Sequence, residues 1–175
     1  KRANAKQNLV SRGTLDDIWS RHVIDSAQLI RFETVSSSSW LDIGAGAGFP
    51  GIVIACLSHL PVTLLEPRKL RAEFLREVID KLNLRAVVQI VKAERASGKF
   101  NLITARAVAS LPKLFEISYH LSTGKTRWVF PKGQSACAEL EQARLSWHGE
   151  FHVEQSLTDA RSHIVVAQNV RPEPS

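Results

Sequence analysis

A glycine-rich segment at positions 41–51, LDIGAGAGFPG, has residue types and spacing that suit close contact with a small ligand. Glycines allow a turning backbone to approach a ligand closely, and Pro50 can open the helix that follows. Glu66 ends the next apolar run, about 20 residues on, where a carboxylate commonly accepts hydrogen bonds from an adenosine ribose. Loop and carboxylate together predict a nucleoside-binding site. The loop residues concerned are Asp42, Gly44, Gly46, Gly48 and Gly51.

Two cofactors fit this segment. Gly46, Gly48 and Gly51 match GxGxxG, in which the phosphates of a dinucleotide lie at a helix N-terminus, so a nicotinamide-dependent dehydrogenase is one alternative. Asp42, two residues before Gly44, extends the pattern to DxGxGxG, which resembles motif I of class I methyltransferases and favours S-adenosyl-L-methionine. In a third interpretation the glycines only let a helix pack against a strand, and Gly51 fits that role best.

The elements that must position this loop follow a regular alternation. From Trp40 onward, short apolar runs alternate with helix-like segments, which is typical of βαβ units and a parallel sheet. Two strand-like runs near the C-terminus, FHVEQSL and HIVVAQNV, have no helix between them and predict an antiparallel hairpin at a sheet edge. We predict an α/β, class I (Rossmann-like) fold, with a mostly parallel seven-stranded sheet and helices on both faces.

Two regions of the chain are predicted. Residues 36–175 form the main domain, and residues 1–35 form an N-terminal helical extension in which 14–31 is an amphipathic helix. The size and 44% hydrophobic content suit one globular core. The sequence contains no methionine, so Lys1 is not a translational start and we expect the extension to be truncated.

Composition narrows the class of protein. No run approaches the roughly 20 apolar residues of a membrane span and the first residues lack the apolar core of a signal peptide, so we expect a cytoplasmic protein. The formal charge of +6 favours an anionic partner such as nucleic acid. Cys56 and Cys137 have no partner at metal-ligand spacing and are expected to be buried or half-buried free thiols.

Several ordered blocks carry a family resemblance. Besides the glycine loop these are NLVSR (8–12), RHVIDS (21–26), LLEPRKLRAEFLREVIDKLNL (64–84), FNLITARAVASL (100–111) and FPKGQ (130–134). Together they resemble the RsmG, or glucose-inhibited division protein B, family over about residues 8–170. Lys92 stands where this family often has an arginine, which keeps the charge but not the bidentate geometry.

The resemblance implies an enzyme that transfers a methyl group from S-adenosyl-L-methionine to guanine N7 in the 530 loop of 16S ribosomal RNA. Gly44 and Phe49 would then line the cofactor pocket, Ala93 and Glu94 would flank the adenine, and Glu66 would hold the ribose. We expect a monomer whose partner is 16S ribosomal RNA or the small ribosomal subunit, with no membrane partner and no metal.

Two basic residues follow apolar strands and should emerge at the carboxyl edge of the sheet, where ligands of open α/β folds collect. Arg106 is the first candidate catalytic residue and by resemblance reaches the cofactor or target base, although an ordinary ion pair is its alternative. Lys132 could meet an RNA phosphate or the target base. His22 and Asp25 share a helix face and, with Ser26, could help close the cofactor pocket.

Guanine N7 carries a lone pair and no proton, so attack on a sulfonium methyl group needs alignment more than a general base. The sequence lacks the Asn/Asp-Pro-Pro-aromatic motif of methyltransferases that act on exocyclic amines. Two other functions stay open at this point. They are the nicotinamide-dependent dehydrogenase and a non-catalytic RNA-binding or assembly protein that keeps a nucleoside pocket.

Overall fold

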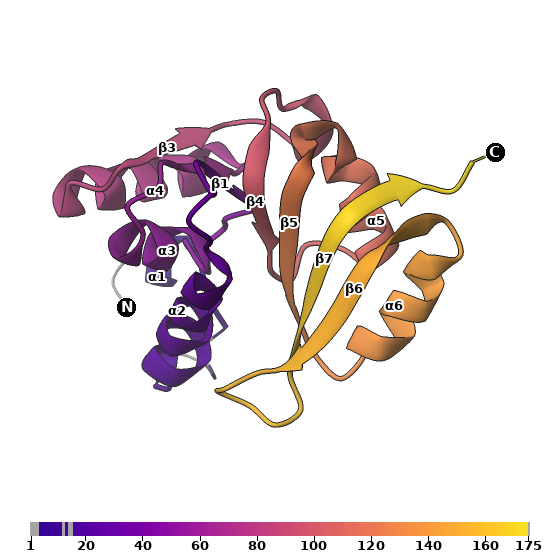
Figure 1. Cartoon of the computed structure of the whole chain (residues 1–175). Coiled ribbons are helices and arrows are strands. Elements are labelled where there is room, and N and C mark those ends of the chain that lie inside the picture. The colour runs from indigo at the N-terminus through magenta and orange to yellow at the C-terminus, as the bar shows by residue number, and fades with distance from the viewer. Residues whose placement is uncertain (1–3, 12, 14–15, 175) are drawn as a thin grey trace.

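The computed structural model describes residues 4–11, 13 and 16–174. Within them, seven strands form one sheet in the order β3-β2-β1-β4-β5-β7-β6 (Figure 1). The strands are β1 (Trp40–Ile43), β2 (Val62–Leu65), β3 (Ala86–Gln89), β4 (Phe100–Ala105), β5 (Ser122–Lys132), β6 (Trp147–Gln155) and β7 (His163–Pro172). The five strands β1 to β5 pair in parallel, whereas β7 is antiparallel to both β5 and β6. The predicted mostly parallel sheet and terminal edge hairpin are confirmed.

Helices cover both faces of this sheet, as predicted. The longer ones are α3 (Gly51–Leu57), α4 (Lys69–Leu82), α5 (Leu111–Ser118) and α6 (Ala136–Arg144). Neighbouring residues of β1 point to opposite faces, because side chains alternate along a strand. Trp40 packs in a core with side chains of α3 and α4, and Leu41 packs in a second core with side chains of α5 and α6.

The described residues before the sheet include helical segments of mixed geometry. A short helix α1 (Asn4–Gln7) is followed by a π-helical segment (Trp19–Ile24), α2 (Asp25–Ala27) and a 3₁₀ segment (Gln28–Phe32), and the last three are continuous. We call residues 19–32 the N-terminal helix. Residues 18–31 of the predicted helix are thus helical and residues 16 and 17 form a turn, whereas residues 14 and 15 lie outside the described residues. Wide π turns are frequent at functional sites, and this one carries His22.

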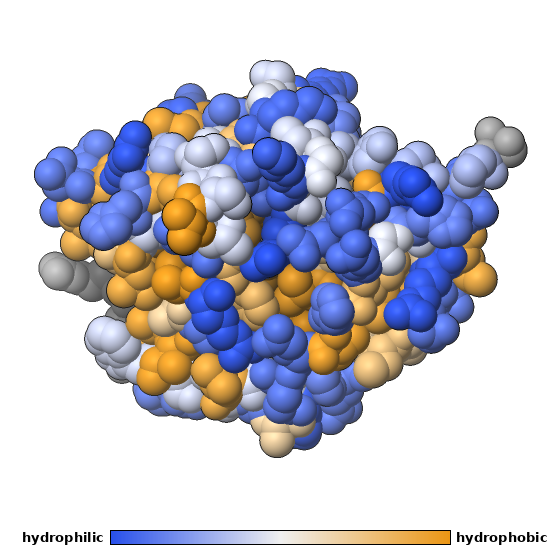
Figure 2. Space-filling view, in the orientation of Figure 1, coloured by the Kyte–Doolittle hydropathy of each residue, from blue (hydrophilic) through white to orange (hydrophobic). Residues whose placement is uncertain are grey.

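The surface shows one correction to the sequence analysis. Cys56 and Cys137 are free cysteines as expected, but both are exposed, so the expectation of buried or half-buried thiols was wrong. Helix α3 buries Val53, Ile54 and Ala55 and then turns its last residues toward solvent, which an apolar run alone cannot reveal. Figure 2 shows the molecule in the orientation of Figure 1, and hydrophobic side chains gather there over the region of α2 and α3.

None of the described helices is both long and apolar enough to span a lipid bilayer. The predicted division between residues 1–35 and 36–175 stays a prediction. Residues 33–39, which include Ser36 and its serine neighbours, form neither helix nor strand and join the N-terminal helix to β1.

Candidate cofactor and substrate site

A buried carboxylate fixes the glycine loop. Asp42 is 1% exposed, and its Oδ2 accepts a hydrogen bond from the Gly51 backbone N–H at 2.9 Å. Its Oδ1 accepts a second hydrogen bond from the Thr104 hydroxyl at 3.0 Å. Burial raises the pKa of Asp42 to about 7, against the opposing effect of these two hydrogen bonds and of the Arg106 charge. Asp42 thereby ties β1 to the start of α3 and to β4.

The glycines of the loop have separate roles. Gly44, Gly46 and Gly48 have φ values of 67°, 55° and 94°, a region that favours glycine. A Cβ on Gly51 would lie 2.2 Å from Leu64 Cδ2, so Gly51 serves close helix packing, as the third interpretation proposed for it. A Cβ on Gly44 would instead lie 2.7 Å from Val108 Cγ2, a clash at the wall of a cavity that both residues line.

Glu66 lies directly after β2, beside the loop. The residue is 3% exposed, and its carboxylate accepts hydrogen bonds from the backbone N–H of Gly46 at 2.9 Å and of Arg68 at 2.8 Å. Because both donors are backbone groups, the position of this carboxylate follows from the course of the main chain. The main chain therefore holds Glu66 next to the turn of the glycine loop. The sequence predicts a ribose-binding carboxylate at this place.

A cavity of about 340 Å³ brings three predicted cofactor residues together. Gly44, Ala93 and Glu94 line it, with apolar walls from Val91, Val108 and Ile117. Asp42 and Glu66 are adjacent in sequence to the lining residues Ile43 and Leu65 but do not line the cavity themselves. Apolar walls beside a glycine turn are a lining that suits an apolar aromatic ring such as adenine.

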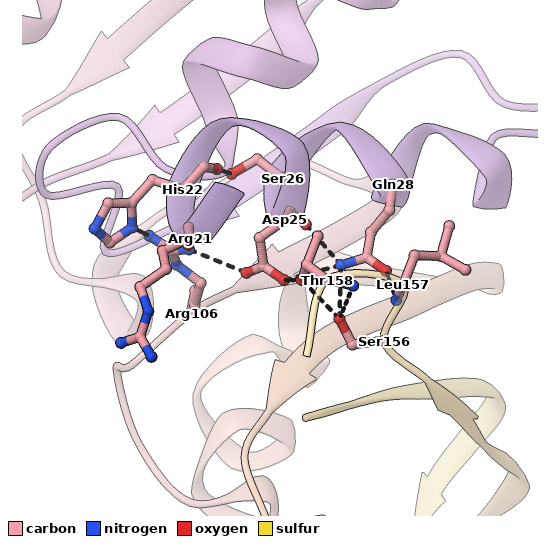
Figure 3. Close-up of polar contacts among 9 residues, drawn as sticks. All are labelled: Arg21, His22, Asp25, Ser26, Gln28, Arg106, Ser156, Leu157 and Thr158. Carbon is pink, nitrogen blue, oxygen red and sulfur yellow. Dashed lines mark hydrogen bonds and ion pairs between the residues drawn. The ribbon is translucent and has the colours of Figure 1, made fainter. Parts of the chain in front are cut away.

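Arg106 makes polar contacts with residues of the N-terminal helix (Figure 3). Its Nη1 donates to Asp25 Oδ2 and to the Arg21 carbonyl, each at 3.1 Å, and its Nη2 donates to His22 Nδ1 at 2.7 Å. The guanidinium carbon lies 5.7 Å from the centre of the Phe49 ring. The expectation that His22 and Asp25 share a face is confirmed, because both contact one arginine.

The protonation of His22 follows from these contacts. A guanidinium can only donate, so Nδ1 accepts and the ring proton resides on Nε2. Burial, and then the charge of Arg106, lowers the pKa of His22, which keeps the ring neutral. The ring stacks on Phe49 with centroids 5.1 Å apart. Its Nε2 is buried and has no hydrogen-bond partner within the described chain.

The network continues from Asp25 into the loop between β6 and β7 (Figure 3). Asp25 Oδ1 accepts from the Thr158 hydroxyl at 2.8 Å and from Gln28 Nε2 at 2.9 Å. Gln28 in turn donates to Ser156 Oγ at 3.1 Å and accepts from the Leu157 backbone N–H at 2.9 Å. Residues far apart in sequence are thereby joined around Arg106.

Lys132 ends β5 and is also held by polar contacts. Its Nζ donates to the Ala109 carbonyl and to Glu139 Oε2, both at 2.7 Å. Burial raises the pKa of Glu139, but the hydrogen bonds from Lys132 and Ser135 outweigh burial and leave the pKa lowered. Lys132 and Arg106 both line a larger cavity of about 540 Å³ next to the first. No three His, Cys, Asp or Glu residues of the described chain are grouped to hold a metal ion.

The sequence analysis missed two residues that the structure places here. Val108 separates the two cavities and faces Gly44, and His163 lines the larger cavity. Val108 is an ordinary apolar residue in the sequence. His163 comes into place through the pairing of β7 with β5, which the sequence does not specify.

The sheet order, the glycine turn after β1 and the carboxylate after β2 define a class I (Rossmann-like) S-adenosyl-L-methionine-dependent methyltransferase. Two solved structures share this fold. A putative S-adenosyl-L-methionine-dependent methyltransferase from Methanococcus maripaludis has a TM-score of 0.66 at 13% identity and covers 93% of each chain. A TehB-like methyltransferase from Corynebacterium glutamicum has a TM-score of 0.67 at 13% identity, covering 96% of this chain and 99% of its own.

The chain belongs to the family of rRNA small subunit methyltransferase G, GidB, whose model matches residues 1–165. The ribosomal RNA small subunit methyltransferase G of Novosphingobium aromaticivorans is 49% identical over 171 residues, which cover 94% of this chain and 74% of that protein. The protein of the same name from Zymomonas mobilis is 43% identical over 178 residues, covering 97% and 80%. Family membership confirms the resemblance and sets aside the dehydrogenase.

Asp42 gives the unfolding free energy a pH dependence. Its folded pKa of about 7 lies above the ordinary value for an aspartate, so this contribution to stability is complete below about pH 4 and is lost as pH rises through about 7. Asp42→Asn has no such titration. In urea unfolding experiments, we expect the free energy of unfolding of the variant minus that of the wild type to increase by about 2–3 kcal/mol from about pH 5 to pH 8. An offset that is the same at all pH values would contradict this.

Gly44→Ala should weaken cofactor binding. The new Cβ would meet Val108 Cγ2 at 2.7 Å, and a φ of 67° is strained for alanine. We expect the Kd for S-adenosyl-L-methionine, measured by calorimetric titration, to rise by about tenfold or more. Gly124→Ala is the matched control, because its Cβ would meet no atom within 4 Å. Equal affinities in the two variants would remove Gly44 from the site.

Proposed function

We propose that this chain transfers the methyl group of S-adenosyl-L-methionine to N7 of a guanine in the 530 loop of 16S ribosomal RNA. One observation carries the proposal: the cavity that joins Gly44 to Ala93 and Glu94 lies beside a glycine turn to which Glu66 is bonded. The curated relatives at 43–49% identity are named as methyltransferases of small-subunit ribosomal RNA.

The residues of this cavity fit the proposed cofactor. Apolar side chains on the walls suit the adenine ring, beside Ala93 and Glu94. Glu66 has each oxygen bonded to one backbone N–H, which leaves lone pairs for the ribose hydroxyls. The absence of a side chain on Gly44 leaves room against Val108. When bound, the cofactor supplies an electrophilic methyl group on a sulfonium centre.

The reaction requires no proton transfer by the protein. The N7 lone pair forms the new N–C bond while the C–S bond breaks and its electron pair stays on sulfur. The guanine ring gains a positive charge and no proton moves, so alignment and exclusion of water are the contributions left to the chain. The preset loop, held by Asp42, and the network around Arg106 are rigid parts of the kind that alignment needs.

Arg106 and Lys132 have distinct proposed parts in this function. Arg106 holds the N-terminal helix against Phe49 and reaches the cofactor or the target nucleotide from the end of β4. Lys132 meets the base or its phosphate from the end of β5. Together with Glu66, Ala93 and Glu94, these residues form the site that we propose.

The partner is 16S ribosomal RNA, free or in the small ribosomal subunit, and we propose that a monomer acts on it. The net charge of +6 suits a phosphate backbone. Such a substrate would place the protein in the cytoplasm. A non-catalytic protein that keeps the pocket for binding is the competing possibility, and the first experiment decides between them.

Transfer of labelled methyl from S-adenosyl-L-methionine should be measured on small ribosomal subunits that lack this modification, with naked 16S ribosomal RNA alongside. We expect the label in 7-methylguanosine after digestion to nucleosides. Label in another nucleoside would refute the choice of base. Binding of the cofactor without transfer to either substrate would favour the non-catalytic protein.

Arg106→Ala should lower kcat/KM for methyl transfer by about 100-fold while the chain stays folded. The change removes the donors that hold His22 and Asp25 and the contact with Phe49, so the site loses alignment, and a 100-fold loss corresponds to about 2.7 kcal/mol of activation free energy. Arg144→Ala, an arginine with a half-exposed side chain on α6, is the control. Unchanged kcat/KM in a folded Arg106→Ala protein would leave Arg106 with a packing role only.

A further inference from the structure

The larger cavity lies next to the proposed cofactor site and is separate from it. The two cavities share Val108 and Ala109, which belong to the segment directly after β4. The larger one, about 540 Å³, is bounded by the end of β4, the end of β5 and the beginning of β7. Only Val108 and Ala109 would lie between a group bound there and the cofactor cavity. The volume is large enough for a nucleobase with part of its ribose.

Two polar side chains stand together in this cavity. Lys132 and His163 are direct partners in the antiparallel pairing of β5 with β7, so their side chains project from the same face of the sheet. Lys132 Nζ uses two of its three N–H donors on Ala109 and Glu139, and one is left. His163 Nδ1 is buried and has no hydrogen-bond partner within the described chain.

The other charged groups in the cavity are already engaged. Both oxygens of Asp25 accept hydrogen bonds, from Arg106, Gln28 and Thr158. Both oxygens of Glu139 do so as well, from Lys132, Ser135 and Leu111. A buried nitrogen without a partner is rare in folded proteins and calls for an explanation, which a bound ligand would supply. His163 Nδ1 is therefore an unsatisfied nitrogen on a residue that lines this cavity, and it can accept a hydrogen bond when the ring proton is on Nε2.

A donor beside an acceptor is the complement of one edge of guanine. Guanine carries the acceptor O6 next to N7, followed by the donors N1–H and the N2 amino group, whereas adenine has a donor at N6 in place of O6. We infer that this cavity receives the target guanine, with Lys132 donating to O6 and His163 Nδ1 accepting from the N–H edge. N7 would then face the segment that separates the cavities. This rests on the proposed function and makes His163 a residue that selects the base.

The decisive experiment compares two substitutions of His163. Asparagine places its Oδ1 acceptor near the position of Nδ1, whereas leucine fills the space without an acceptor. We expect His163→Leu to raise KM for the RNA by about tenfold or more and His163→Asn to stay within about threefold of the wild type. His163→Gln, whose amide lies one bond farther out, is a second variant without a correctly placed acceptor and should behave like leucine. His152→Leu, an exposed histidine of β6, is the control.

A packing role for His163 predicts the reverse order, because leucine is the larger apolar replacement. Wild-type KM in His163→Leu, or a loss in His163→Asn that equals the loss in His163→Leu, would overturn the inference while methylation by the wild type upholds the proposed function. The Kd for S-adenosyl-L-methionine should be unchanged in all three variants, and a parallel loss of cofactor affinity would also overturn it. A wild type that methylates neither RNA nor subunits would refute both.

Discussion

The site depends on one buried carboxylate. Asp42 accepts hydrogen bonds from the first residue of α3 and from Thr104 of β4, so a single side chain sets the turn between β1 and α3 and its distance from β4. Gly51 is necessary for this arrangement, since a Cβ there would lie 2.6 Å from Asp42 Oδ2. Because the turn is fixed in this way, Gly44 faces Val108 and the backbone of Gly46 meets Glu66.

A second layer of constraint comes from Arg106. It joins three parts of the chain that no local rule brings together: the N-terminal helix, the glycine loop through Phe49, and the end of β4. Asp25 and Gln28 extend the same network to the loop between β6 and β7. The N-terminal helix thus closes one side of the site, and Asp25 contributes to the wall of the larger cavity.

Local sequence patterns were sufficient to predict the fold and to point to part of the proposed site. Alternating apolar runs and helices specify βαβ units, and the glycine spacing with Glu66 predicts a nucleoside site, because both signals depend on near neighbours in sequence. Contacts between distant parts of the chain could not be predicted from such local patterns. That Lys132 stands opposite His163, and that Arg106 meets His22 and Asp25, depends on strand register and on helix placement, which one sequence does not encode in any short segment. The exposure of Cys56 was missed for the same reason.

The central claim is that two adjoining cavities at the carboxyl edge of the sheet hold cofactor and target base. It is tested most directly by an experimental structure of the protein with S-adenosylhomocysteine and guanosine monophosphate bound. The account predicts the ribose of the cofactor product on Glu66, its adenine beside Ala93 and Glu94, and the guanine against Lys132 and His163. Guanine in any other place, or a cofactor product bound away from the glycine loop, would contradict it.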